Sequence, residues 1–362
     1  MTDERTLTET DIRHAVEISQ FGKKNVILDS QILTTLMACE RLMDFRFNHN
    51  LVAIAGKSNS LECGSMVHVF MEYFYGNIIK GLPRDKAFQY GIAAAELYVR
   101  GCPTCTNYIP IACDICKDGQ VEIQDDLTTA WIPCSKCGGK GNIIKPPCGH
   151  KINEFPGLKN TPRDSEDYKT GWQWVLDTCD QYYNFYRNDH WVPLEVEVVK
   201  GEILYEDDEI RVLWKAKLDW TADTNQGIYP IDHKTMKQRR DTISMNNQFI
   251  GQCIIMKTRG IFINKIGFQT SLKPEEKFTR IIIPYSESRL LEWQSETLPY
   301  YSKLLLMYTE SGHFPPRFTH CEGKYGTCAF LKVCESNPDM REEEIKKTFF
   351  VGPEWNPSNE DD

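Results

Sequence analysis

Residues 210–220 read IRVLWKAKLDW, and residues 228–234 read IYPIDHK. Both segments are rich in Val, Ile, Trp and Tyr, and a short polar connection separates them, which predicts two neighbouring strands. Asp219 stands at the end of the first strand, where a charged side chain is costly unless it has a partner or a function. Asp232 and Lys234 are two residues apart on the second strand, so their side chains leave the same face of the sheet.

Asp219 and Asp232 come together if these two strands end side by side. Adjacent carboxylates repel one another unless a divalent cation lies between them, and Mg²⁺ or Mn²⁺ is the natural choice for oxygen ligands. Such a cation activates a bound water and offsets charge on an attacked phosphate, while Lys234 orients the water or stabilises the transition state. The spacing also fits a pair of strand-end salt bridges, because Asp167 and Lys169 repeat it in a polar helical stretch.

The segments on both sides of these strands predict an α/β protein. Apolar residues with helical spacing predict helices at residues 30–47, 64–80, 164–190, about 243–257 and from Ser286 onward. Residues favourable to strands occur at 192–199, 210–220, 228–234, 262–270 and 278–285. Ser30 is a candidate N-cap of the first helix. The last ten residues are polar and acidic, so we expect them to be disordered.

The composition limits the class of protein. The chain has 362 residues, of which 41% are hydrophobic and 26% charged, as is ordinary for a globular protein. It contains no apolar run long enough for a transmembrane helix, and Met1–Thr10 lacks the apolar core of a signal peptide. We therefore expect a cytoplasmic protein, in the host cytoplasm if a phage encodes it. In that reducing setting its 14 cysteines favour metal binding over structural disulfides.

The charge pattern bears on possible ligands. The net charge of −9 excludes a general basic coating for nucleic acid, so any positive surface for DNA must be local. Lys237, Arg239 and Arg240 follow Lys234 and form one such cluster, although a short basic run also fits an ordinary solvated face. The sequence lacks a Gly-x-x-x-x-Gly-Lys-Ser/Thr phosphate loop, so we do not expect ATP hydrolysis.

The order of the motifs resembles the RecB-like branch of the PD-(D/E)XK nucleases. The matching segments, in the family's order, are Gly64-Ser-Met-Val-His68 for the Gly-x-x-x-His helix, Lys217-Leu218-Asp219 for the strand aspartate, Asp232-His233-Lys234-Thr235 for the Asp-x-Lys-Thr strand, and Asn247-Gln248-Phe249-Ile250-Gly251-Gln252 at the place of the Gln-x-x-x-Tyr helix. Order and approximate spacing agree over residues 30 to 335.

The resemblance implies a role for each matching residue. His68, Asp219 and Asp232 would bind Mg²⁺ or Mn²⁺. Lys234 would be the catalytic lysine, and Gln248 would contact the DNA or position the site.

Three further positions are less regular. Glu197 would be the accessory acid that some relatives carry, or an outward-facing strand residue. Gln252 replaces the tyrosine of the last motif, which puts the DNA-holding role of that position in doubt. Lys217 stands where relatives often have glycine.

A C-terminal cluster contains Cys321, Cys328 and Cys334. Three thiolates need a fourth ligand to complete a metal site. Cys39 is the best candidate, because the segment LMACERLMDF around it resembles the first cysteine of iron–sulfur nucleases in this superfamily, among them AddB-type helicase–nucleases and the nucleases of CRISPR adaptation. The resemblance implies a 4Fe–4S cluster that ties the two ends of the domain together. The alternative is zinc on the same cysteines, or with His320 in place of Cys39.

Residues 101–150 contain seven of the 14 cysteines and several glycines and prolines, which indicates a small inserted module. Two Cys-x-x-Cys pairs separated by 17 residues predict a zinc site, at Cys113, Cys116, Cys134 and Cys137. The remaining candidates for a second zinc are Cys102, Cys105, Cys148 and His150. The latter four also fit free thiols, or ligands that exchange with the first set.

The expected fold is an α/β restriction-endonuclease-like core, a central mixed sheet flanked by helices, with a zinc-binding insertion and an iron–sulfur closure. The expected parts are a helical N-terminal part with Cys39 and the His68 helix (1–100), the zinc insertion (101–151), the nuclease core (152–312), and the iron–sulfur cysteines with an acidic tail (313–362).

The expected activity is hydrolysis of DNA phosphodiesters, by an exonuclease of recombination, repair or phage DNA metabolism. DNA ends, including single-stranded ones, would be the substrate, and recombination or replication proteins the partners. The choice of an exonuclease rests on analogy with relatives. One alternative is a non-catalytic, zinc-containing nucleic-acid-binding or scaffold protein on a nuclease-like fold. Another is an RNA nuclease that uses the same site.

Overall fold

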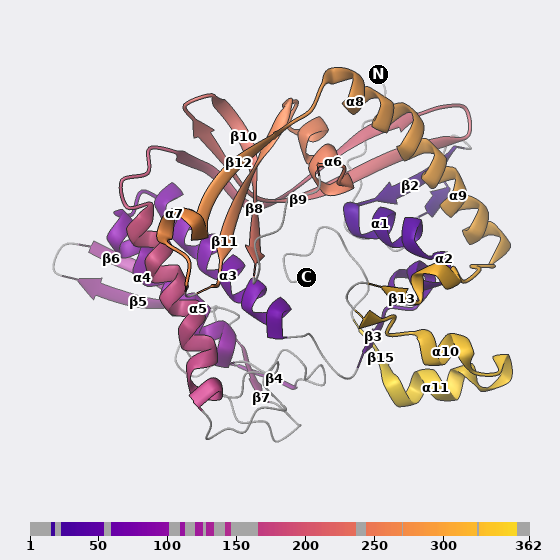
Figure 1. Cartoon of the computed structure of the whole chain (residues 1–362), viewed down its shortest axis with the longest axis horizontal. Coiled ribbons are helices and arrows are strands. Elements are labelled where there is room, and N and C mark those ends of the chain that lie inside the picture. Colours follow the sequence, from indigo (N-terminus) through magenta and orange to yellow (C-terminus); the bar gives the residue numbers. More distant parts are fainter. Residues whose placement is uncertain are drawn as a thin grey trace.

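A computed structural model gives the fold of the chain (Figure 1). It describes residues 16–18, 23–53, 59–100, 109–112, 120–125, 128–133, 142–145, 166–236, 244–269, 271–323 and 326–352. The strands are β1 (Val16–Ile18), β2 (Lys24–Leu28), β3 (Leu51–Ala53), β4 (Ile109–Ala112), β5 (Gln120–Asp125), β6 (Thr128–Pro133), β7 (Asn142–Lys145), β8 (Val192–Glu206), β9 (Ile210–Thr224), β10 (Gly227–Met236), β11 (Gly260–Gly267), β12 (Phe278–Pro284), β13 (Glu322–Gly323), β14 (Gly326–Thr327) and β15 (Phe349–Val351).

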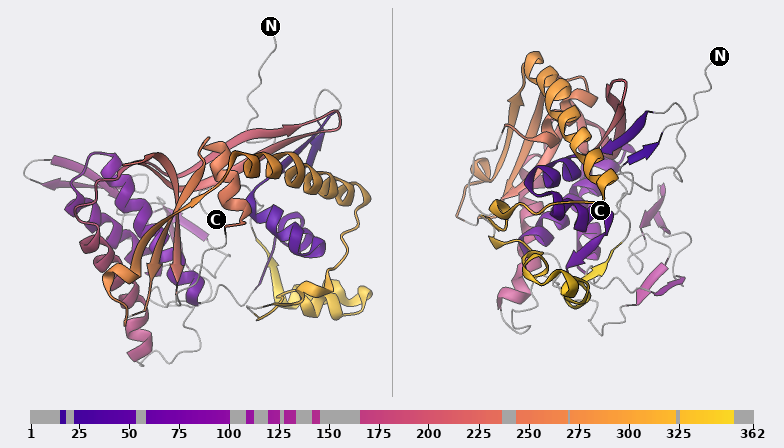
Figure 2. Two further views of the ribbon diagram at one scale, coloured as in Figure 1. Left: turned by 45° about the horizontal axis from the view of Figure 1, so that its top comes forward. Right: turned by 90° about the vertical axis from the view of Figure 1, so that its right-hand side faces the viewer.

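The α-helices are α1 (Ser30–Ala38), α2 (Glu40–Met43), α3 (Asn59–Ile79), α4 (Arg84–Arg100), α5 (Glu166–Phe185), α6 (Asn247–Ile255), α7 (Pro274–Lys277), α8 (Glu287–Glu292), α9 (Leu298–Ser311), α10 (Leu331–Glu335) and α11 (Arg341–Thr348). Figures 1 and 2 show α3, α4 and α5 gathered at one end of the molecule, and α1, α9, α10 and α11 at the other. Among the described helices, none is both long and apolar enough to span a bilayer.

The largest sheet has seven strands in the order β1-β2-β9-β10-β11-β12, with β8 paired to β9. The pairs β2–β9 and β10–β11 are parallel, and the other pairs in this sheet are antiparallel. The expectation of an α/β fold with a mixed sheet flanked by helices is therefore confirmed.

The long strand β9 changes neighbours along one edge. On its other edge, β8 follows it from Arg211 to Asp223. The edge of β9 opposite β8 pairs with β2 as far as Trp214 and with β10 from Trp220 onward. Among the described strands, none pairs with residues 215–219 on this edge. Instead, the Gln252 side chain of α6 donates to the Lys217 carbonyl at 3.0 Å. This interval in the strand pairing contains Asp219.

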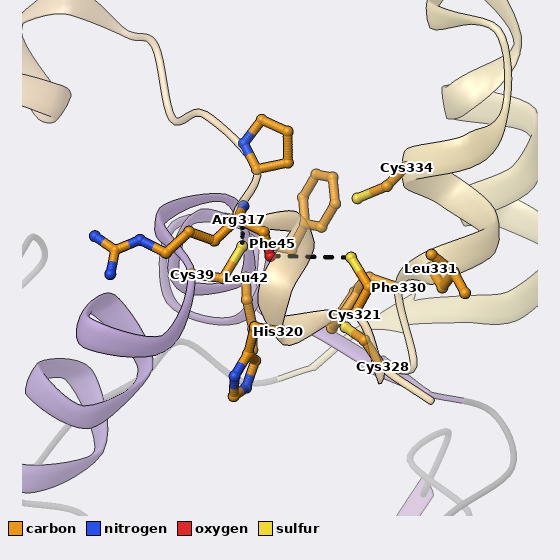
Figure 3. Close-up of a pocket in the computed structure, with 11 residues that line it drawn as sticks. Cys39, Leu42, Phe45, Arg317, His320, Cys321, Cys328, Phe330, Leu331 and Cys334 are labelled. Carbon is orange, nitrogen blue, oxygen red and sulfur yellow. Dashed lines mark hydrogen bonds between the residues drawn. The ribbon is translucent and has the colours of Figure 1, made fainter. Parts of the chain in front are cut away.

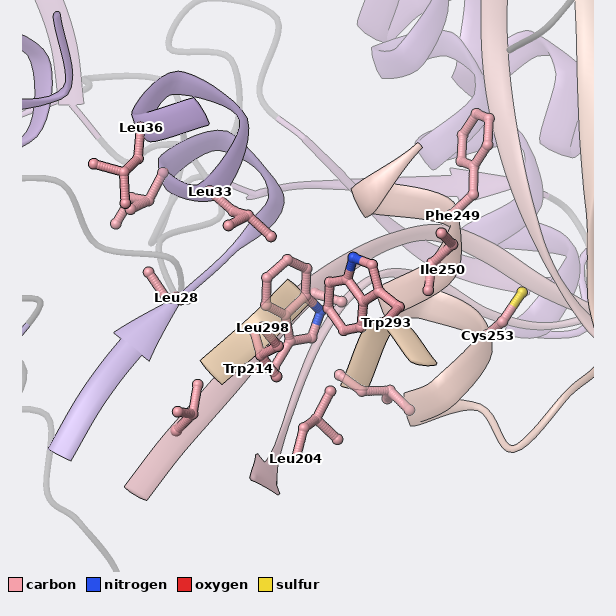
Figure 4. Close-up of a cluster of buried hydrophobic side chains, with 14 of the residues drawn as sticks. Leu28, Leu33, Leu36, Leu204, Trp214, Phe249, Ile250, Cys253, Trp293 and Leu298 are labelled. Atoms are coloured by element: carbon pink, nitrogen blue, oxygen red, sulfur yellow. The ribbon is translucent and has the colours of Figure 1, made fainter. Parts of the chain in front are cut away.

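Two apolar cores hold helices against the sheet. The first surrounds Trp214, whose ring meets that of Trp293 edge-on with centroids 5.1 Å apart, and it includes side chains of α1, α6 and α9 (Figure 4). The second surrounds Trp220, which stacks on Tyr75 of α3 at 4.0 Å between centroids and is joined by side chains of α5. Burial of these large side chains drives the packing and fixes α3 and α6 on β9.

The first predicted helix is not continuous. Residues 30–47 were expected to form one helix, but α1 ends at Ala38 and α2 begins at Glu40. Cys39 between them is extended, with φ −165° and ψ 123°, and a π-helical turn follows at Asp44–Asn48. Apolar spacing continues through the break, so periodicity alone does not reveal it. The break sets Cys39 apart from both helices.

The helix caps were predicted with mixed success. The N-cap of α1 is Asp29, whose side chain accepts from the Ile32 backbone N–H at 2.7 Å, so the expectation of Ser30 is wrong by one residue. Either residue type can cap a helix, and the deciding factor is the extended backbone of Asp29. Ser286 does cap α8, accepting from the Arg289 N–H. The sequence analysis did not predict α4 or β2.

A glycine at the contact between α6 and β9 generates a stability prediction. A Cβ at Gly251 would overlap the buried indole of Trp214, whereas a Cβ at Gly76 of α3 would meet nothing within 4 Å. Gly251→Ala should therefore lower the free energy of unfolding by about 1–3 kcal/mol. Gly76→Ala should leave it unchanged or raise it by up to about 1 kcal/mol through helix propensity. Urea denaturation followed by circular dichroism compares the two variants, and equal effects would contradict this packing.

Candidate active site and cysteine pocket

Asp219 lies where β9 and β10 part. The last paired residues of the two strands are Trp220 and Ile231, one step before Asp219 and Asp232. Beyond that point, the His233 backbone N–H donates to Asp219 Oδ2 at 2.7 Å. A side-chain carboxylate thus replaces the carbonyl of a regular strand pair. This bond fixes the Asp219 side chain between the two strands.

Asp232 belongs to a close triangle with Lys234 and Gln248. Its side chain is fully buried, and Lys234 Nζ lies 2.7 Å from its Oδ2. Gln248 Nε2 donates to Asp232 Oδ1 at 2.8 Å, and Lys234 Nζ donates to Gln248 Oε1 at 3.3 Å. Asn246, the N-cap of α6, accepts from the Gln248 backbone N–H and so fixes the start of this helix. The predicted residues Asp232, Lys234 and Gln248 are in mutual contact.

The two aspartates have opposite pKa shifts. Burial and the neighbouring Asp219 raise the pKa of Asp232 to about 6. Burial alone would also raise the pKa of Asp219, but the charges of His68 and Lys234 and the hydrogen bond from the His233 backbone N–H hold it below its usual range. The repulsion between the two carboxylates favours a bound cation, because a cation offsets it.

A second group of side chains has the geometry of a metal site. His68 of α3 places Nδ1 3.6 Å from Asp219 Oδ2. Glu197 comes from β8, and the residues directly before and after Glu197 pair with β9. One ligand atom from each of His68, Glu197 and Asp219 lies within 4.8 Å of the other two. An imidazole and two carboxylates in this arrangement fit one divalent cation.

The predicted ligand set differs from this group at one position. Asp232 was expected to join His68 and Asp219, but its carboxylate contacts Lys234 and Gln248. The structure brings Glu197 into the group instead. Of the two alternatives for Glu197, the accessory acid fits this position better than an outward strand residue, because its side chain is only 17% exposed. The identity of the ligands stays a prediction.

The backbone of Glu197 is unusual. Its φ is +52°, in the left-handed region that residues other than glycine rarely adopt. Such a conformation costs on the order of 1–3 kcal/mol and persists only where the surroundings enforce it. Lys217 Nζ lies 3.1 Å from Glu197 Oε2. Burial and the nearby Asp219 nevertheless raise the pKa of Glu197 to about 7.

Gly64 allows the His68 helix to approach the second strand. A Cβ at this position would lie 3.1 Å from Thr235 Oγ1 of β10, which is closer than nearly all real Cβ contacts. The absence of a side chain therefore lets α3 lie against β10 near Lys234. The Gly-x-x-x-His spacing places His68 one helical turn further along α3.

Gln252 and Lys217, the two residues that depart from the RecB-like motifs, are in contact. Gln252 is 1% exposed, and its amide holds the Lys217 carbonyl. Gln252 therefore braces β9 at the interval in the strand pairing and does not lie on an open surface.

A buried polar network supports His233 from behind. Asn264 of β11 lies 2.8 Å from His233 Nδ1 and donates to the Tyr182 hydroxyl at 2.9 Å. Arg280 of β12 reaches the same hydroxyl at 3.2 Å and pairs with Asp189 at 2.7 Å. Burial lowers the pKa of His233 to about 3, so its ring is neutral at neutral pH. Asn264 and Arg280 were not predicted from the sequence, although polar residues inside apolar strands are a usable signal.

Four cysteines line one pocket at the other end of the molecule. Figure 3 shows the thiols of Cys39, Cys321, Cys328 and Cys334 facing this pocket. Cys39 thus joins the C-terminal cysteines, as the sequence analysis expected of a fourth ligand. The Arg317 backbone N–H donates to Cys39 Sγ at 3.2 Å. The cysteines in the described part of the chain form no disulfides.

The thiols of this pocket affect one another. Burial and the neighbouring Cys328 and Cys39 raise the pKa of Cys321, and burial likewise raises that of Cys334. Ionisation of all four thiols at this place would therefore need a cation to offset the charge. His320 also lines the pocket, but in Figure 3 its ring extends away from the sulfur atoms. The arrangement favours Cys39 over His320 as the fourth ligand.

Several predicted residues lie outside the part of the chain that the structure describes. They are the zinc candidates Cys113, Cys116, Cys134, Cys137, Cys102, Cys105, Cys148 and His150, the basic residues Lys237, Arg239 and Arg240, and the last ten residues. The zinc sites and the basic DNA contact therefore stay predictions.

Comparisons with known proteins add little to the site. No protein-family model matches the chain, and no curated protein matches it. The fold matches weakly a solved structure titled "Crystal structure of SSO0001", with 13% identity and a TM-score of 0.25. That match covers 43% of this chain and 71% of the other. A likeness this weak supports no conclusion about function.

The raised pKa of Glu197 predicts how metal affinity depends on pH. With a pKa of about 7, Glu197 is mostly protonated at pH 6 and mostly ionised at pH 8. Mn²⁺ binds the ionised form, so its affinity should rise over this range, by up to about tenfold per pH unit for one displaced proton. Isothermal titration calorimetry with Mn²⁺ at pH 6, 7 and 8 measures this.

Two variants assign the pH dependence to its source. Glu197→Gln should weaken Mn²⁺ binding and flatten its rise with pH. Glu195→Gln changes a carboxylate on the same strand that pairs with Lys200 at 2.9 Å, so the rise should remain. A wild-type affinity that does not change between pH 6 and 8 would contradict the placement of Glu197 at the metal.

Proposed function

We propose that the chain is a metal-dependent DNA nuclease with a restriction-endonuclease-like core. The observation that supports this best is the convergence of two acids, a lysine and a glutamine at the interval in the strand pairing. The convergent residues are Asp219, Asp232, Lys234 and Gln248, with His68 and Glu197 beside them. The arrangement combines oxygen and nitrogen ligands for a hard cation with a fixed ammonium group.

The carboxylates of Asp219 and Glu197, with His68, would hold Mg²⁺ or Mn²⁺. A cation bound there would lower the pKa of a water and offset the charge of a phosphate. The His233 N–H holds the Asp219 carboxylate in place between the two strands. The left-handed backbone of Glu197 is unusual within a strand. It supports a role for this residue beyond that of an ordinary strand position.

Lys234 would act as a cation and not as a base. Burial alone would lower its pKa, but Asp232 and Asp219 keep it above its usual value. The ammonium group is therefore charged at neutral pH, and its side chain is 39% exposed, which leaves it accessible to a substrate. Asp232 and Gln248 fix its position. A fixed ammonium beside the scissile phosphate stabilises charge that develops in the transition state.

The substrate we propose is DNA at its ends, single-stranded ends included, with an exonuclease as the mode of action. Recombination or replication proteins are the proposed partners. These choices rest on the resemblance to RecB-like nucleases.

The four-thiol pocket would hold a 4Fe–4S cluster that closes the domain. Cys39 and Cys334 are almost three hundred residues apart in sequence, so a shared cluster would restrict the unfolded chain strongly. Direct contacts also join the segment around Cys39 to the C-terminal part. Arg317 pairs with the buried Glu40 and donates to the Met37 carbonyl. Zinc remains the proposed metal of the inserted module.

Substitutions of Asp232 and Lys234 test the proposed nuclease activity directly. Asp232→Asn and Lys234→Met should each reduce Mn²⁺-dependent degradation of end-labelled DNA on the order of a hundredfold or more. Asp223→Asn changes an exposed aspartate further along β9 and should keep wild-type activity. The assay uses single-stranded DNA, double-stranded DNA and an RNA of the same sequence in parallel.

The outcomes of this assay separate the functions. Degradation of RNA alone would contradict DNA as the substrate. A wild-type protein that binds DNA and degrades nothing with either Mg²⁺ or Mn²⁺ would contradict a nuclease.

Cysteine substitution tests the cluster. Anaerobically purified wild-type protein should be brown and contain close to four iron atoms per chain, as a 4Fe–4S cluster requires. Cys328→Ala should remove most of the iron and the visible absorbance. Cys63→Ala, at a buried cysteine of another core, should retain both. Zinc in place of iron in the wild-type pocket would contradict the iron–sulfur assignment.

A further inference from the structure

A lysine that the proposed mechanism does not use lies beside the metal-binding group. Lys217 Nζ is 3.1 Å from Glu197 Oε2, and the Glu197 oxygens belong to the group that fits a divalent cation. Lys217 and Asp219 are two residues apart on β9, so their side chains leave the same face of that strand. The ammonium group therefore occupies the immediate surroundings of the site.

The backbone under Lys217 is held in place from another element. The buried Gln252 amide of α6 binds the Lys217 carbonyl at 3.0 Å, within the interval where β9 has neither β2 nor β10 on that edge. The side chain of Lys217 is 30% exposed and that of Glu197 is 17% exposed. Both side chains are therefore partly open to solvent, the lysine more so than the carboxylate.

We propose that Lys217 is a stand-in cation: it neutralises Glu197 until a divalent cation binds, and then binds a phosphate of the substrate. The second half of this proposal rests on the proposed nuclease function. Before metal binding, the ammonium offsets the charge that Glu197 and Asp219 would otherwise place side by side. A divalent cation is a stronger partner for both carboxylates and releases the ammonium.

A neighbouring ion pair provides a matched control. Lys200 Nζ lies 2.9 Å from Glu195, on the same pair of strands. The exposure of Lys200 is 31%, close to that of Lys217, but Glu195 does not belong to the metal-binding group. The two lysines have similar exposure and face different carboxylates.

Mn²⁺ titration of the full-length protein tests the first half. The measurement is made at one fixed pH for every variant. Lys217→Met removes a competing positive charge a few ångströms from the metal, so the Mn²⁺ dissociation constant should fall roughly tenfold. Lys217→Arg and Lys200→Met should remain close to wild type. Unchanged or weaker Mn²⁺ binding by folded Lys217→Met would overturn the stand-in role.

DNA binding tests the second half. Ca²⁺ serves as a metal that supports binding without turnover, and a fluorescent single-stranded oligonucleotide is titrated with and without it at several salt concentrations. With Ca²⁺, Lys217→Met should lower the slope of log affinity against log salt by about 1, as loss of one phosphate contact requires. Without Ca²⁺, the two proteins should bind alike. An equal effect in both conditions, or none in either, would overturn the phosphate contact.

The stand-in role is tested separately from the proposed function, whereas the phosphate contact depends on it. If wild-type protein binds no DNA, the nuclease proposal and the phosphate contact fall together. The Mn²⁺ titration still decides the stand-in role in that case, because it requires no nucleic acid.

Discussion

The hydrogen bond from the His233 N–H to the Asp219 carboxylate marks the point on which the site depends. At this point β10 leaves β9, and a side chain replaces the regular strand partner. The interval that results is lined by Lys217 and Asp219, and the side chain of Gln252 reaches into it. Charged groups are tolerated there because they satisfy one another and the exposed backbone. A continuous strand pair would leave no place for them.

Helix α6 connects the parts of the molecule that carry chemistry. Its Gln248 binds Asp232, and its Gln252 binds β9. Its Asn247 accepts from the Trp293 indole and donates to the Met37 sulfur, two residues before Cys39. The helix that positions the acids therefore also packs against the segment that presents the first cysteine.

The sequence predicted the parts of this site that depend on local pattern. The strands around Asp219 and Asp232 follow from residue type and order. The Gly64–His68 motif and the grouping of Cys39 with the C-terminal cysteines were implied by the resemblance to RecB-like nucleases. It did not predict the break at Cys39, because apolar periodicity continues across it. It also left Glu197 undecided, since a left-handed backbone at a non-glycine residue has no sequence signal. Contacts such as Lys217 with Glu197 depend on strand register, which motifs do not specify.

The central claim is that one divalent cation binds where β9 and β10 part. The most direct measurement is the anomalous scattering of manganese in a crystal of the protein grown with Mn²⁺. The account predicts a manganese peak within coordination distance of His68, Glu197 and Asp219, with the Lys234 ammonium nearby. Manganese bound elsewhere, or these three side chains turned away from one another in the crystal, would contradict it.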